Sequence, residues 1–149
     1  MSDPHVGARL DAVIDLSARA DPDAVAALAA AAIGDVDSSV RLEAVAALAA
    51  RPGEAARQAL TQALADPDPE VRREAVEALA QMGGTASVQA LAEALLDADS
   101  ALRAEAVDAL GDLGGERAIE LMRQAANTDE SPAVRRTAQD YLVDLPGAQ

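Results

Sequence analysis

The chain has 149 residues, a formal net charge of −14 at pH 7 and no cysteine, so neither a disulfide nor a thiolate zinc site can form. Its 12 cationic side chains, all arginine, face 26 carboxylates, which argues against the basic surface of a nucleic-acid-binding protein. No uninterrupted run of about 18 apolar residues and no basic, apolar leader is present, so we expect neither a membrane span nor a secretory signal and predict a cytoplasmic protein.

One phrase recurs along the chain at a nearly constant interval. Its arginines are spaced by 32, 31, 31 and 32 residues, at Arg9, Arg41, Arg72, Arg103 and Arg135. An aspartate stands six residues before each of them, at Asp3, Asp35, Asp66, Asp97 and Asp129. A fixed period of this length is typical of a stacked repeat array. We predict one domain, residues 1–149, with repeats at about 3–34, 35–65, 66–96 and 97–128 and a half repeat at 129–145.

Each copy carries the pattern of an amphipathic helix followed by a second one. In the third copy the apolar residues follow the spacing i, i+4, i+7, i+8, i+11, at Val71, Ala75, Ala78, Leu79 and Met82. The second helix of that copy has its apolar face at Val88, Leu91 and Leu95. Because no alternating β pattern appears, the sequence predicts an all-α chain of four helix pairs and a closing single helix.

Start and stop residues mark the ends of these helices. Asp68-Pro69 and Ser131-Pro132 each place a capping side chain before a proline, which favours a helix start. Gly83-Gly84 and Gly114-Gly115 supply the positive φ at which a helix ends. The matching breaks in other copies are Asp21-Pro22 and Arg51-Pro52-Gly53.

A single helix pair is too thin to bury its own apolar stripe, so neighbouring pairs must stack. Alanine at 44, 75 and 106 lets helix axes approach toward the short end of the usual range of about 8–10 Å. The one aromatic residue, Tyr141, stands where the inner copies have alanine, and we interpret it as a plug at the end of the stack. The alternative is a tyrosine that stacks on a ligand.

The phrase Asp-x-Asp-x-x-Val-Arg-x-x-Ala-x-x-Ala-Leu, followed by Gly-Gly and a second helix, resembles the HEAT repeat, and more narrowly the PBS-lyase HEAT-like type. The resemblance covers the chain from Asp3 to Leu145 and implies a right-handed α-solenoid, an α-α superhelix of about four HEAT-like helix pairs plus a C-terminal capping helix. It also implies a structural ladder between turn aspartates and the arginines six residues later. The ladder residues are Asp35, Arg41, Asp66, Arg72, Asp97, Arg103 and Arg135.

The same resemblance places the first helix of each copy on a concave inner face, where the varying residues would meet a partner. The candidate partner-binding residues on this face are Glu43, Arg73, Glu74, Glu77, Glu105, Asp108, Asp112, Arg136 and Asp140. Two interpretations stay open. The face is either an acidic groove for a basic or mixed basic–apolar segment of another protein, or the solvated side of a protein whose acidity reflects a halophilic habitat.

Residues for catalysis are not evident in the sequence, and we predict that the chain is not an enzyme. His5, the one histidine, is interpreted as a cap or surface residue, so no metal site and no cofactor are expected. The Asp-x-Asp pairs lack the glycine and the glutamate of a calcium loop and fit capping roles better. The Gly-Gly pairs follow helices, which fits stop signals and not phosphate cradles.

The leading hypothesis is a monomeric, non-enzymatic scaffold or assembly module that binds a partner protein in its concave acidic face. One alternative is an accessory subunit of an enzyme, such as a bilin-lyase-like factor. Another is an engineered HEAT-like binder scaffold, although the uneven turns favour a natural origin.

Overall fold

The computed structural model describes residues 4–51 and 53–144, and over these residues the chain forms nine helices and no strand. This confirms the all-α prediction of four helix pairs and a closing helix. The predictions made for Asp3, Pro52 and Leu145 fall outside the described residues. None of the nine helices combines the length and the apolar character needed to cross a lipid bilayer.

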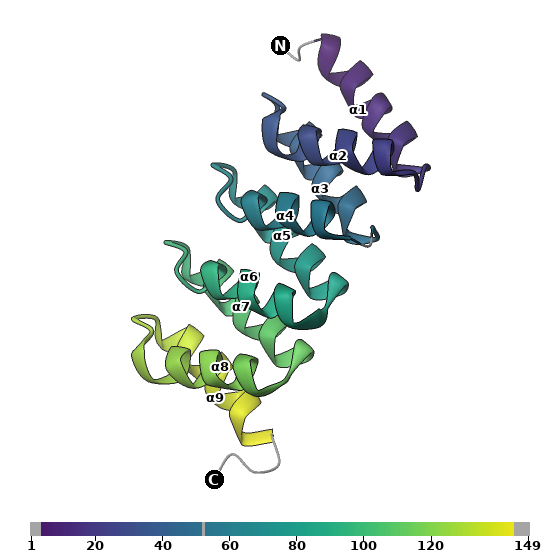
Figure 1. The fold of residues 1–149 in the computed structure, drawn as a ribbon. Coiled ribbons are helices and arrows are strands. Elements are labelled where there is room, and N and C mark those ends of the chain that lie inside the picture. Colours follow the sequence, from purple (N-terminus) through teal and green to yellow (C-terminus); the bar gives the residue numbers. More distant parts are fainter. Residues whose placement is uncertain (1–3, 52, 145–149) are drawn as a thin grey trace. The chain divides into compact units, whose positions relative to one another are not determined.

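Contacts group the helices into two compact units, residues 1–82 and 83–149. The first unit holds α1 (Pro4–Ser17), α2 (Pro22–Gly34), α3 (Ser38–Ala49), α4 (Glu54–Ala63) and α5 (Pro69–Met82). Here the first helices α1, α3 and α5 pack side by side in one layer, and the second helices α2 and α4 form the other layer (Figure 1).

The second unit repeats this arrangement with α6 (Gly84–Ala94), α7 (Ser100–Leu113), α8 (Glu116–Thr128) and α9 (Pro132–Asp144). The first helices α7 and α9 pack against each other, and α8 packs against both of them. The second helices α6 and α8 touch only sparsely, in contrast to α2 and α4 in the first unit. Whether the two units form one domain stays a prediction.

Helix ends lie where the sequence signals place them. α5 begins at Pro69 and ends at Met82, directly before Gly83, whose φ is +68°. α7 likewise ends before Gly114, which has a φ of +66° and donates its N–H to the carbonyl of Leu110. Only glycine adopts this backbone region without strain, so each glycine turns the chain into the second helix of its copy.

The core of each unit is built from the same two positions of the first helices. Leu48 in α3, Leu79 in α5 and Leu110 in α7 are fully buried, and so are the alanines four residues before them. The alanines let the helices approach closely, and the leucines fill the space between the layers. In the end copies the equivalent Leu16 and Leu142 are only half-buried.

Truncating a central leucine should therefore cost more than truncating the equivalent one at the end. We expect Leu48→Ala to lower the free energy of unfolding by about 2–5 kcal/mol, since it leaves a cavity among fully buried neighbours. Leu16→Ala, at the half-buried position of α1, is expected to cost less than half of that. Urea denaturation followed by circular dichroism measures both, and equal losses would contradict the packing described.

Candidate functional site

A buried arginine joins consecutive inter-repeat turns in the first unit. Arg41 Nε and Nη2 donate to the two carboxylate oxygens of Asp66 at 2.7 and 2.8 Å, and Arg41 Nη1 donates to the backbone carbonyl of Asp35 at 2.9 Å. Arg41 is 8% exposed and Asp66 9%. The arginine thus bonds the turn of its own copy through a backbone carbonyl and the turn of the following copy through a carboxylate.

The second unit repeats the geometry at Arg103. This guanidinium donates to both carboxylate oxygens of Asp129 at 2.8 and 3.0 Å and to the carbonyls of Asp97 and Ala98 at 2.8 and 3.3 Å. Its remaining Nη2 hydrogen is shared with Glu130 Oε1 at 3.3 Å. All five N–H groups of Arg103 therefore have acceptors.

The end copies keep part of this arrangement. Arg9 Nε donates to the carboxylate of Asp35 at 2.9 Å, and Arg135 Nη1 donates to the carbonyl of Asp129 at 2.7 Å. Arg72 Nη1 makes the corresponding bond to the carbonyl of Asp66 at 2.9 Å. For Arg41, Arg72, Arg103 and Arg135 the aspartate six residues earlier supplies its backbone carbonyl. The carboxylate partner of Arg9, Arg41 and Arg103 comes from the next copy.

The turn aspartates also start the following helix. Asp66 accepts the N–H of Asp68 at 2.8 Å, and Asp68 in turn accepts the N–H of Glu70 at 2.9 Å. The Asp-x-Asp pairs thus act as turn and cap residues. Among residues 4–51 and 53–144, no three His, Cys, Asp or Glu side chains come together in a way that could hold a metal ion. His5 lies exposed in the first turn of α1.

Hydrogen bonding sets the charge state of the buried aspartates. Burial alone would raise the pKa of Asp66, but the bonds from Arg41 and from the N–H of Asp68 outweigh burial and hold that pKa below its usual value. The bonds from Arg103 are the largest influence on Asp129 and lower its pKa. Both groups are carboxylates at neutral pH.

Three candidate partner-binding carboxylates lie together in the first unit. Glu43 on α3 and Glu77 on α5 are exposed, and Glu74 on α5 is half-buried. The pKa of Glu74 is raised, first by burial and then by the nearby charges of Glu77 and Glu43. Arg73 on the same helix is exposed and pairs with Glu70 at 3.5 Å. The cluster is therefore a region of negative potential.

The second unit has its own acidic cluster on α7, beside Tyr141 of α9. Asp108 and Asp112 are exposed one turn apart, and the pKa of Asp108 is raised by burial and then by Asp112. Tyr141 Oη lies 3.4 Å from Asp112 Oδ1, and burial followed by the two carboxylates raises the pKa of the phenol. Glu105 on α7 is half-buried. Arg136 and Asp140 on α9 are exposed. One continuous acidic row through both units stays a prediction.

Gly111 is a residue that the sequence pattern did not single out. It lies in α7 beneath the ring of Tyr141, and a Cβ at this position would overlap with the ring carbons Cδ1 and Cε1. The inner copies have Ala49 and Ala80 at this position. The tyrosine thus packs on α7 in the space that the missing methyl group leaves. The signal was present in the sequence as a glycine at a repeat position that the two preceding copies fill with alanine.

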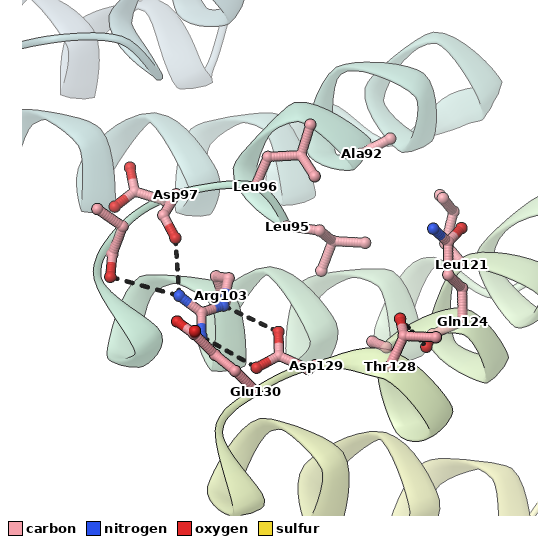
Figure 2. Close-up of a pocket in the computed structure, with 12 residues that line it drawn as sticks. Ala92, Leu95, Leu96, Asp97, Arg103, Leu121, Gln124, Thr128, Asp129 and Glu130 are labelled. Carbon is pink, nitrogen blue, oxygen red and sulfur yellow. Dashed lines mark hydrogen bonds and ion pairs between the residues drawn. The ribbon is translucent and has the colours of Figure 1, made fainter.

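A pocket of about 440 Å³ lies on the other side of the second unit, between α6 and the C-terminal half of α8. Figure 2 shows Arg103 and its ion pairs at one end of this pocket and Leu121 and Gln124 at the other. Leu95 and Leu96, which follow α6, supply much of the apolar wall. Of the candidate residues predicted from the sequence, only the ladder residues Asp97 and Arg103 line this pocket.

Comparison with protein families identifies the repeat. Two overlapping segments, residues 1–68 and 58–143, match the family described as HEAT repeats, and together they span almost the whole chain. The chain belongs to the HEAT repeat family. No curated protein matches this HEAT repeat chain.

Solved structures share the α-solenoid fold of this HEAT repeat protein. Human deoxyhypusine hydroxylase, in complex with glycerol, matches at 26% identity with a TM-score of 0.72, over 84% of this chain and 43% of the hydroxylase. The chain thus spans less than half of that enzyme. The complex of CpcE and CpcF of phycocyanin lyase from Nostoc sp. PCC7120 matches at 20% identity with a TM-score of 0.62, over 90% of this chain and 98% of that one. A designed armadillo repeat protein in complex with the peptide (KR)4 matches at 21% identity with a TM-score of 0.54, over 90% and 80% of the two chains.

The buried ion pair predicts how stability depends on pH. Because the folded-state pKa of Asp129 is lowered, its stabilising contribution is complete above the unfolded-state value of about 3.9 and is lost as the pH falls through the folded-state value. We expect Asp129→Asn to lower the free energy of unfolding at pH 7 by about 3 kcal/mol, because buried Arg103 loses its bidentate carboxylate and keeps only the longer contact to the exposed Glu130. The variant should also lose less stability below pH 4 than the unmodified protein does. Urea titrations from pH 7 to pH 2 measure both effects. Asp99→Asn is the matched control, since asparagine caps a helix as well as aspartate does.

The contact between Gly111 and Tyr141 predicts that Gly111→Ala destabilises the protein when the tyrosine is present and stabilises it when the tyrosine is removed. Gly111→Ala should destabilise the protein by about 1–3 kcal/mol, because the new methyl group overlaps with the ring. In a Tyr141→Ala background the same substitution should stabilise the protein by up to about 1 kcal/mol, which is the helix preference of alanine over glycine. Thermal unfolding of the four variants tests this, and an equal effect of Gly111→Ala in both backgrounds would contradict the contact.

Proposed function

We propose that this HEAT repeat protein acts without catalysis and binds a basic segment of a partner protein through the acidic side chains of its first helices. The observation that carries the proposal is the cluster of Glu43, Glu74 and Glu77 on neighbouring helices. The pKa of Glu74 is raised by burial and then by Glu77 and Glu43, and a nearby cation would offset both influences. Asp108 and Asp112 offer a second negative region of the same kind.

The cost of this charge to the fold supports a role in binding. A carboxyl group whose pKa is raised on folding makes the folded state less stable once it is ionised. Glu74 and Asp108 are both in this situation, whereas the buried ladder aspartates have lowered pKa values. The ionised carboxylates at 74 and 108 thus do not stabilise the fold in the way that the ladder aspartates do, which is consistent with a role in binding.

A structural neighbour provides an analogy for the partner. The designed armadillo repeat protein that shares the fold is in complex with (KR)4, a peptide of alternating lysine and arginine. The sequence identity of 21% carries only the fold, so the analogy concerns what an α-solenoid can hold and not which residues hold it. The residues that support binding of a basic segment are the acidic clusters of this chain, Glu43 with Glu74 and Glu77, and Asp108 with Asp112.

A second candidate is an accessory subunit of an enzyme. It is favoured by the match to the CpcE–CpcF complex of phycocyanin lyase, which covers 98% of that chain. The same acidic residues would then contact the acceptor protein. Copurification with a stoichiometric protein partner and no pigment favours the scaffold, and a shift of pigment absorbance on mixing with bilin and acceptor favours the subunit.

The peptide (KR)4 serves as the probe for the acidic surface. We expect binding that weakens steeply between 20 and 150 mM NaCl, because charges near the surface are screened over this range. The double variant Glu43→Lys, Glu74→Lys should lower the affinity about tenfold or more at low salt, since two attractions become repulsions. Isothermal titration calorimetry measures the dissociation constants.

A matched control separates local contacts from net charge. Glu116→Lys with Glu120→Lys makes the same change in net charge on α8, a second helix, where both side chains are exposed. This control should lower the affinity by no more than about threefold through long-range attraction. Equal losses in the two double variants would show that (KR)4 responds to net charge alone and would rule out the proposed site.

A further inference from the structure

The pocket between α6 and α8 results from how the second helices pack in the second unit. In the first unit α2 and α4 pack closely, and α2 is rich in alanine. In the second unit α6 and α8 make few contacts, and the pocket of about 440 Å³ lies in the space between them. That volume lies in the usual range of sites that bind small molecules or single side chains.

The apolar wall of this pocket is not required by the repeat. Leu96 is 84% exposed at the pocket, and the equivalent positions of the other copies are Gly34, Ala65 and Thr128. Three copies thus fold without a large apolar side chain at this position. With Leu95 and Leu121, Leu96 forms a surface that could cover an aliphatic side chain.

The arginine in the pocket does not make it a site for anions. All five N–H groups of Arg103 already bond to the Asp129 carboxylate, two turn carbonyls and Glu130 (Figure 2). An incoming phosphate or carboxylate would have to displace one of these bonds and would face the surrounding carboxylates. Asp129 and Glu130 line the same end, and the Glu130 side chain is 86% exposed, so a carboxylate is accessible from solvent there.

We propose that this pocket binds a segment of a partner protein in which a large aliphatic side chain stands next to a lysine or arginine. The aliphatic group lies against Leu95, Leu96 and Leu121, and the cation lies near Glu130. This pairing matches the lining of the pocket, since the wall is apolar and the exposed carboxylate of Glu130 lies at the rim. The site is on second helices and is independent of the acidic side chains of the first helices.

The experiment uses the full chain with labelled leucine methyl groups and the dipeptide N-acetyl-Leu-Lys-amide as the probe. We expect saturable NMR shifts at Leu95, Leu96 and Leu121, with half-saturation on the order of a millimolar, as suits a ligand of this size. N-acetyl-Ala-Lys-amide should bind at least tenfold more weakly, because it lacks most of the apolar surface. N-acetyl-Leu-Glu-amide should bind several-fold more weakly, because its charge is repelled.

Two variants of exposed residues localise the effect. Leu96→Ala, which restores the residue found at Ala65, should weaken binding of the Leu-Lys probe at least threefold. Val36→Ala is the matched control, because Val36 is equally exposed at 87% in a turn of the first unit and should leave binding unchanged. The Glu43→Lys, Glu74→Lys variant should also bind the probe normally, so the failure of either proposal is distinguishable from the failure of the other. Absence of saturable shifts at the three leucines, or an equal response to the Leu-Glu probe, would overturn the assignment.

Discussion

The arginine that bonds two consecutive turns is the interaction on which the rest of the structure depends. Arg41 and Arg103 each hold a backbone carbonyl of one turn and the carboxylate of the next turn. The carboxylate also accepts the N–H two residues further on, which sets up the cap of the following helix. One buried pair therefore fixes the turn conformation, the start of a helix and the offset between copies.

Removing such an ion pair from water costs free energy, and this cost favours the one offset between copies at which the pair can form. A guanidinium and a carboxylate removed from water are stable only when nearly all their hydrogen bonds are made. A shift of the stack by a residue would leave both groups buried and unpaired. The period of 31 or 32 residues follows from this requirement as much as from the length of the helices. The alanines and leucines of the core then pack in the offset that the ion pair selects.

The repeat pattern was sufficient to predict the helices, and the proline and glycine signals predicted the start of α5 and the ends of α5 and α7. The ladder implied by the family resemblance joined each arginine to the aspartate six residues earlier, whereas Arg41 and Arg103 bond only the carbonyl of that aspartate and take the carboxylate of the next copy. Every copy contains an equivalent aspartate, so the alignment does not distinguish the two. Arg51, interpreted from the sequence only as part of a break, also donates to the carbonyl of Ser17 and so joins the ends of α3 and α1. The pocket was missed for a related reason. It depends on the distance between α6 and α8, and a repeat pattern describes each copy and not the variation in how copies pack.

The contact between Tyr141 and Gly111 has a consequence for the evolution of the array. Repeat proteins lengthen when a copy is duplicated within the gene, and an inner copy can be inserted wherever its neighbours accept it. The helix that carries Tyr141 packs less well after the copies that contain Ala49 or Ala80, since either alanine would place a methyl group where the ring of Tyr141 lies. We therefore expect Gly111 and Tyr141 to be retained together when copies of the repeat are duplicated.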